Sequence, residues 1–132
     1  MEEEEAPLAE SAHNKQRMID KKLRKFRRES PEVIESFLNF WRQAKKPSAI
    51  PTKYKELIQL AIVLASHCEL CIYKHVKLCL LAGATRAEIL DAAAQALTVG
   101  DSIVYEYLAY VVDALDYYEP VIKGNENLSG KT

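Results

Sequence analysis

The segment that most constrains the fold runs from Leu57 to Ala65, "LIQLAIVLA", and is apolar on nearly every side of a helix. Pro51 and Thr52 stand before it and indicate where that helix begins. A helix without a polar face is stable only where other elements cover most of its surface. The sequence therefore predicts a central helix with further elements packed around it.

Two helices are expected before this central one. Met18, Ile19, Leu23 and Phe26 fall near one face of a helix with otherwise basic faces, which predicts a first helix at about residues 12–29. The sequence "SPE" then predicts a new start, with the serine as N-cap and the proline at the first helical position. The helix that follows should end before "KKPSAIP".

Three helices are expected after the central one, and each has recognisable end signals. The run after "SHCE" is helical in pattern, and Gly83 is well placed to end it in a left-handed conformation. Thr85 and Glu88 form the capping-box pattern, in which each side chain accepts a backbone N–H of the other residue. Gly100 should end that helix, and Asp101 or Ser102 should cap the next.

The last helix is expected to end at about residue 118, because Pro120 follows it. The alternating, turn-bounded runs of a β-sheet are absent from the sequence. We therefore predict an all-α bundle of five to six helices. Its expected parts are a flexible acidic N-terminus (1–11), one helical domain (12–119) and a polar C-terminal tail (120–132).

Composition limits the class of protein. A chain of 132 residues with 48% hydrophobic and 28% charged residues fits one globular domain. Its net charge of −1 argues against a dedicated nucleic-acid binder, although residues 15–28 are strongly basic. No apolar run approaches the ~18–20 residues of a membrane span, and the acidic N-terminus "MEEEEAPLAE" is unlike a signal peptide. We expect a cytoplasmic protein with no membrane contact.

The motif "HCELCIYKH" contains the side chains most able to take part in a reaction. Cys68, Cys71 and His75 are spaced i, i+3 and i+7, so on a helix they share one face. Cys68 should lie in the first turn, where free N–H groups and the helix dipole favour a thiolate. That position favours Cys68 as the attacking thiol, but the spacing alone leaves open which cysteine attacks and which closes the disulfide.

The same motif has other possible uses. Covalent haem attachment needs a histidine where the chain has Ile72, and a thioredoxin-type dithiol normally follows a strand. A four-ligand zinc site is excluded because Cys68 and Cys79 would be ~16 Å apart along one helix. A three-ligand zinc site, with or without His67, stays open, and so does simple packing of small residues. Cys79 lies in the apolar run "LCLLAG" and is expected in the core.

Glu56 is a candidate acid–base residue. It lies on the central helix on the same stripe as Leu60 and Val63, so its carboxylate should be buried with them. Burial disfavours the charged form of a carboxylate and suits it to proton transfer. An equally open reading is a solvated acid near the helix N-terminus that interacts with the helix dipole.

Residues 55–97 resemble the core of the carboxymuconolactone decarboxylase family, in particular its alkylhydroperoxidase D-like (AhpD-like) branch. The pattern of that branch is a Glu, then Cys-x-x-Cys-x-x-x-His twelve residues later, a helix end at Ala-Gly-Ala and a new helix beginning Thr-x-x-Glu. The residues that match it in register are Glu56, Cys68, Cys71, His75, "AGAT" at 82–85 and Glu88.

The resemblance implies an all-helical fold, a homotrimer or homohexamer, and thiol-dependent peroxidase or disulfide reductase activity without a metal or organic cofactor. By position, Cys71 would be the peroxidatic thiol, Cys68 the resolving thiol, and Glu56 with His75 the proton relay. The best-known member of the branch has a further relay histidine before the second cysteine, where this chain has Leu70. Because the decarboxylases of the wider family lack the cysteine pair, lactone decarboxylation is not expected here.

The resulting hypothesis is a cytoplasmic antioxidant oxidoreductase that acts on a peroxide or disulfide substrate and is reduced by an external dithiol donor. The first alternative is a non-enzymatic redox-sensing or binding module, in which the basic stretch at 15–28 contacts an acidic partner or nucleic acid. The second is structural zinc at Cys-x-x-Cys-x-x-x-His.

Overall fold

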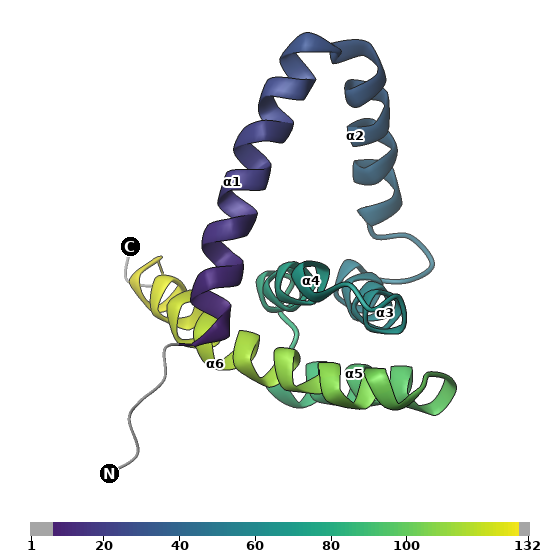
Figure 1. Ribbon diagram of the computed structural model, residues 1–132, viewed down its shortest axis with the longest axis vertical. Coiled ribbons are helices and arrows are strands. Elements are labelled where there is room, and N and C mark those ends of the chain that lie inside the picture. Colours follow the sequence, from purple (N-terminus) through teal and green to yellow (C-terminus); the bar gives the residue numbers. More distant parts are fainter. Residues whose placement is uncertain (1–6, 130–132) are drawn as a thin grey trace.

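The computed structural model describes residues 7–129, with side chains through residue 124, and that part of the chain holds six helices and no strand. The helices are α1 (Leu8–Glu29), α2 (Pro31–Lys45), α3 (Thr52–Ala65), α4 (Glu69–Leu81), α5 (Arg86–Val99) and α6 (Ser102–Ser129), arranged as in Figure 1. The predicted all-α fold is confirmed.

The helices form a core of four and a projecting pair. α3 packs against α4 and α5, and α6 packs against α4 and α5. α1 and α2 join at Ser30 and form a long hairpin that stands on this core, as Figure 1 shows. The largest fully buried side chains come from α3, α4, α5 and α6: Leu60, Leu64, Ile72, Val76, Cys79, Ile89, Val104, Val111 and Leu115. The core is therefore built around the α3–α4 hairpin, which carries the candidate site.

The prediction of a covered central helix is right for part of α3. Leu57, Leu60 and Leu64 are buried, and Leu60 and Leu64 are completely inaccessible. On another face, Ile58 and Ile62 are 47% and 58% exposed. One apolar face of α3 is thus uncovered in the single chain.

The predicted helix ends around α5 are confirmed. Gly83 has φ of +90°, a conformation that a residue without a Cβ adopts at little cost. The Glu88 N–H donates to Thr85 Oγ1 at 3.1 Å, and the Thr85 N–H donates to Glu88 Oε1 at 3.0 Å, which completes the capping box. Gly100 ends the helix as expected. Asp101 then caps α6, because its Oδ1 accepts the N–H groups of residues 103 and 104.

The N-terminal boundary of the helical part lies earlier than predicted. α1 begins at Leu8 instead of about residue 12, so residues 8–11 are helical. Ala9 is fully buried, and its N–H donates to Asp113 Oδ2 on α6 at 2.6 Å. This contact joins residues far apart in the sequence, so no local sequence pattern predicts it. Residues 1–6 of the expected acidic segment lie outside the described part of the chain.

The C-terminal boundary lies later than predicted. α6 continues through Pro120 to Ser129, so the expected end at about residue 118 is wrong. A proline inside a helix removes one hydrogen bond and destabilises the helix by about 3 kcal/mol. Burial of Ile122, which is 9% exposed and belongs to the core, favours continuation. The expected tail is therefore helical through residue 129, and residues 130–132 are not described.

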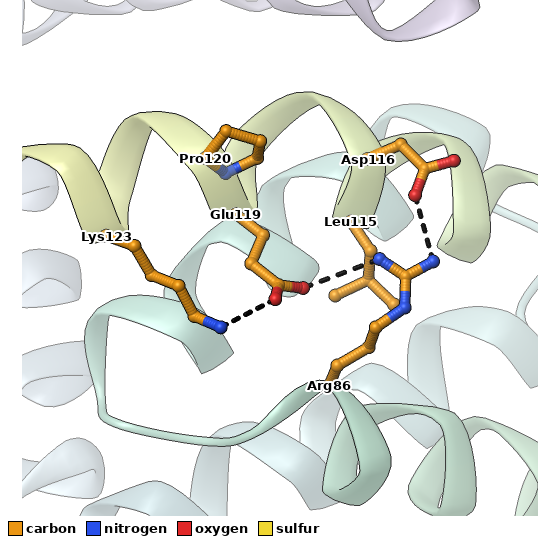
Figure 2. Close-up of a pocket in the computed structure, with 6 residues that line it drawn as sticks. All are labelled: Arg86, Leu115, Asp116, Glu119, Pro120 and Lys123. Carbon is orange, nitrogen blue, oxygen red and sulfur yellow. Dashed lines mark hydrogen bonds and ion pairs between the residues drawn. The ribbon is translucent and has the colours of Figure 1, made fainter.

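An ionic network spans the same region of α6 and ties it to the start of α5. Figure 2 shows Arg86 beside Asp116 and Glu119, with Lys123 on the other side of Glu119. The distances are 2.9 Å from Arg86 to Asp116, 3.4 Å to Glu119, and 2.8 Å from Lys123 to Glu119. The charges around this open pocket of about 310 Å³ pair with one another. We therefore read the pocket as structural.

None of the described helices combines the length and the apolar composition needed to cross a bilayer.

Thr85→Ala tests the capping box. Loss of a side-chain N-cap should lower the free energy of unfolding by about 1 kcal/mol, because Glu88 N–H loses its acceptor. Urea denaturation followed by circular dichroism would measure this. Thr98→Ala is the matched control: it removes an exposed threonine at the other end of α5, and it should change the free energy of unfolding by less than about 0.5 kcal/mol.

Candidate active site

The cysteine pair lies at the start of α4. Cys68 is the N-cap residue and Cys71 is in the first turn, with the two Cα atoms 5.2 Å apart and the sulfur atoms joined in a disulfide. The Cys71 N–H also donates to Cys68 Sγ at 3.3 Å. Both residues are partly exposed. The sequence prediction that they meet is confirmed, and the N-cap position gives the Cys68 sulfur a backbone donor.

A tight connection places Cys68 at this end of the helix. α3 ends at Ala65, and His67 adopts a positive φ of 56°, which is uncommon for a residue other than glycine. The N–H of Cys68 donates to the Val63 carbonyl at 3.3 Å, so the chain turns back on α3 at once. The His67 ring lies 5.7 Å from that of Tyr107, with Nε2 3.3 Å from Asp101 Oδ1. His67 therefore belongs to the contact between this turn and α6.

His75 lies one turn beyond Cys71 on the same helix and is partly buried. Its Nδ1 atom is buried and has no hydrogen-bond partner in the described part of the chain. Burial, and then the positive charges of Lys45 and Lys74, lower the pKa of His75 to about 4. The imidazole is therefore neutral at pH 7 and has a nitrogen free to accept a proton.

Glu56 is buried, with 5% exposure, which agrees with its place on the apolar stripe of α3 and rules out the open alternative of a solvated acid. Its carboxylate partner was not predicted. Lys45, the last residue of α2, donates from Nζ to Glu56 Oε1 at 2.6 Å and to Oε2 at 2.7 Å. The carboxylate thus binds a lysine, and no hydrogen bond joins it to His75 among the described contacts.

Lys45 is the residue of this region that the sequence analysis missed. It stands in "AKKP" at the end of a helix, where a lysine is usual because it interacts favourably with the helix dipole. In the structure it is only 8% exposed, although α2 otherwise contributes no buried residue. A buried lysine needs a nearby acid, but the sequence does not show which acid that is.

Cys79 and the rest of this helix face show no metal site. Cys79 is fully buried, and burial followed by the charge of Glu56 raises the pKa of its thiol to about 12. Its predicted place in the core is confirmed. Within residues 7–124, no group of three or more His, Cys, Asp or Glu side chains could hold a metal ion. The zinc alternative therefore has no support in the described geometry.

Leu70, which stands where the resemblance would place a further histidine, faces another part of the molecule. It lines a cavity of about 220 Å³ between α1 and α4, together with Tyr73 and Tyr118. The described relay candidates are thus His75 on α4 and Glu56 on α3.

The sequence matches a known protein family. The profile of the carboxymuconolactone decarboxylase family matches residues 31–114, which include α2 to α5 and all four candidate residues. No curated protein matches the chain.

Solved structures agree with this match. A carboxymuconolactone decarboxylase family protein from Legionella pneumophila, in its apo form, is 32% identical over 83% of this chain and 96% of that chain, with a TM-score of 0.72. A family member from Thermotoga maritima, for which a role in the antioxidative response has been suggested, is 28% identical over 83% and 93%, with a TM-score of 0.72. A second structure of the Thermotoga protein is 31% identical over 70% and 84%, with a TM-score of 0.64.

With most of its length matched by the family profile and its fold shared with these structures, the chain belongs to the carboxymuconolactone decarboxylase family.

Proposed function

We propose that this protein is a cytoplasmic thiol-dependent oxidoreductase of the AhpD-like branch, which reduces a peroxide or disulfide with the Cys68–Cys71 pair. The observation that carries the proposal is the disulfide at the start of α4, with partly exposed cysteines and a neutral histidine one turn away. The suggested antioxidative role of the Thermotoga relative supports the same chemistry.

The reaction begins with the reduced pair. A thiolate, Cys71 by family position, attacks the O–O bond of a hydroperoxide, so that an S–O bond forms and the O–O bond breaks. The alkoxide takes a proton and leaves as an alcohol, and the sulfur is oxidised by two electrons to a sulfenic acid. Cys68 then forms the S–S bond, and the hydroxyl leaves with a proton as water. An external dithiol reduces the disulfide by exchange and becomes a disulfide itself.

In this proposal His75, one turn beyond Cys71 on α4, takes the thiol proton. Its ring is neutral and one nitrogen lacks a partner, so it can accept a proton as the thiolate forms. Glu56 would draw that proton onward, through His75 or a water. In the disulfide state its carboxylate is bound to Lys45, so this step needs the lysine contact to give way.

Two arguments bear on which thiol attacks the peroxide, and they favour different cysteines. The family position assigns the attack to Cys71, whereas the N-cap geometry gives Cys68 a backbone N–H donor and the positive end of the helix. In both orders the product is the disulfide seen here, so the overall reaction is the same.

Exposed apolar surfaces support the proposal that the chain associates with copies of itself. Phe26, Phe37 and Trp41 line an apolar groove of about 440 Å³ between α1 and α2, with arginines at its rim. On α6, Ile103 and Tyr105 are exposed beside the acidic Glu106. Apolar surfaces of opposite charge suit a contact between copies, and a head-to-tail contact closes into rings. We include a homotrimer or homohexamer in the proposal.

Cys68→Ser and Cys71→Ser should each slow peroxide consumption by at least about 100-fold in the presence of a dithiol, because neither variant can form the disulfide. Cys79→Ala is the control and should retain the rate, since this thiol is buried away from solvent. Thiol counting after one equivalent of peroxide should show the loss of two thiols in the wild type. Unchanged consumption in both serine variants would exclude the proposal.

The neutral state of His75 predicts a pH dependence of stability. Between pH 6.5 and about 4 the unfolded chain binds a proton at this residue and the folded chain does not, so the free energy of unfolding falls as the pH falls. From pH 7 to pH 5 the wild type should lose about 1 kcal/mol more than His75→Gln, after allowance for partial exposure. Urea titrations at the two pH values would measure this. Equal losses would show that His75 titrates normally.

Light scattering of the purified protein should give a mass of a trimer or hexamer of 15.0 kDa chains. Phe37→Glu should shift the mass toward the monomer, because it places a charge in the apolar groove. Lys22→Glu, a change at an exposed residue that does not line the groove, is the control and should leave the mass unchanged. A monomeric wild type would rule out the assembly.

A further inference from the structure

A cavity of about 220 Å³ lies between α1 and α4, on a side of α4 that the cysteine pair does not occupy. Its lining residues on α4 follow the helical repeat from Leu70 through Lys77 to Leu81. Cys71 and His75 stand roughly 100° around the same helix from this line. The cavity is therefore separate from the candidate active site, and the proposed thiol chemistry gives it no role.

Two tyrosines form fixed walls of this cavity. Tyr73 is 2% exposed, and its hydroxyl donates to Asp113 Oδ2 on α6 at 3.0 Å. Tyr118 is 6% exposed, and its hydroxyl lies 3.0 Å from His13 Nδ1 on α1. Because each hydroxyl already has a partner, the rings keep their positions when the cavity fills. Together with the leucines of α4 they offer a preformed apolar surface.

Three cations line the same cavity: Arg17 of α1, and Lys74 and Lys77 of α4. None of the ion pairs found within residues 7–124 involves any of the three. Lys77 is half-buried, and its Nζ lies 5.6 Å from the centre of the Tyr118 ring, so the ammonium rests against the aromatic wall. The cavity thus combines an apolar lining with cations that have no carboxylate partner in this part of the chain.

The charge around the cavity is positive on balance. Asp20 is the one acid among the described residues that line it, and it accepts a hydrogen bond from the neutral Gln16 amide at 2.9 Å. His13 is neutral at pH 7, because burial and then the charges of Lys77 and Arg17 lower its pKa from the ordinary 6.5. These two cations from different helices therefore act on one region. Three cations and one carboxylate leave an excess of two positive charges.

We propose that the cavity between α1 and α4 is a binding site for a small organic anion that has one carboxylate on a short, unbranched apolar chain. The carboxylate would pair with Lys77 and Arg17, and the chain would pack on the leucines and the two tyrosines. The lining residues extend over roughly 16 Å of α4, so the space is long and narrow. Its volume of about 220 Å³ equals that of roughly seven water molecules in the liquid, which limits the chain to about six carbons.

Both parts of this ligand are needed to match the cavity. A neutral apolar molecule would cover the walls but would leave the ammonium of Lys77 desolvated without a counter-ion. A small hydrated ion such as inorganic phosphate would meet the cations but would gain nothing from the leucines and tyrosines. The combination of charge and apolar surface therefore favours an amphipathic anion over either simpler ligand.

Calorimetric titration of the full-length protein with sodium hexanoate tests the site. The dissociation constant should be about 1 mM or lower, as expected for an efficient ligand of this size. Hexan-1-ol, which lacks the charge, and inorganic phosphate, which lacks the chain, should each bind at least about 10-fold more weakly. Amide shifts in nitrogen-15 NMR spectra should place hexanoate in the cavity, with the largest changes near Ala12 and Leu70.

Three variants and a control identify the cations that bind hexanoate. Lys77→Met and Arg17→Met should each weaken binding by at least about 5-fold, because each removes one charge. Arg17 is exposed, so its variant keeps the test sound if Lys77→Met folds poorly. Lys77→Arg retains the charge and should bind within about 3-fold of the wild type. Lys22→Met removes an exposed charge of α1 that does not line the cavity, and it should bind like the wild type.

The result is independent of the redox function. Absence of hexanoate binding would overturn the site, and so would equal affinity for hexan-1-ol or for phosphate. Equal weakening in Lys22→Met and Lys77→Met would also overturn it, because binding would then follow the overall charge of the chain. If the cysteine variants consume peroxide like the wild type, the proposed function fails while the hexanoate titration still decides this site. If they do not, and hexanoate fails to bind, only this inference fails.

Discussion

The turn between α3 and α4 is the constraint on which the site depends. Two cysteines three residues apart can form a disulfide at a helix start, because their Cα atoms are then close enough for the sulfur atoms to bond. Here the Cα atoms of Cys68 and Cys71 are 5.2 Å apart. The left-handed conformation of His67 returns the chain along α3, so the two helices run antiparallel. Residues at equal distances from this turn therefore lie side by side. Measured along the helix axes, Glu56 lies roughly 16 Å from the turn and His75 roughly 12 Å. The Glu56 carboxylate therefore lies nearer to Cys79 than to His75.

Local signals predicted the middle of the fold well. Gly83, the Thr85 capping box and Gly100 depend on contacts within a few residues, which the sequence shows directly. The two outer boundaries failed because contacts between distant parts of the chain decide them. Ala9 is helical and buried because α6 supplies a carboxylate for its N–H, and α6 passes Pro120 with Ile122 in the core. Helix propensity and proline rules cannot anticipate such partners.

The same distinction between local signals and distant contacts applies to the candidate site. The meeting of Cys68 and Cys71 follows from spacing on one helix, and the burial of Glu56 follows from the apolar stripe of its own helix. The partner of Glu56 comes from α2, and nothing in the sequence around Lys45 distinguishes it from the exposed Lys46. The burial of Glu56 is confirmed, whereas the Glu56–His75 relay stays a prediction. The structure adds an ion pair between Glu56 and Lys45 that the family pattern alone does not contain.

The same ion pair connects the projecting hairpin to the chemistry of the core. Lys45 is the buried residue of α2, while the apolar side chains of that helix, such as Phe37 and Phe40, are 57% and 69% exposed. Moving the hairpin away would leave the Glu56 carboxylate buried without a counter-ion, a state that costs about 3–5 kcal/mol. The end of α2 is thus held on the core by this ion pair, whereas the start of α1 is held by the burial of Ala9 and Ala12 and by the bond from Ala9 to Asp113. The contact that fixes the end of α2 therefore also occupies the carboxylate of Glu56, so the position of the hairpin and the environment of this acid are linked.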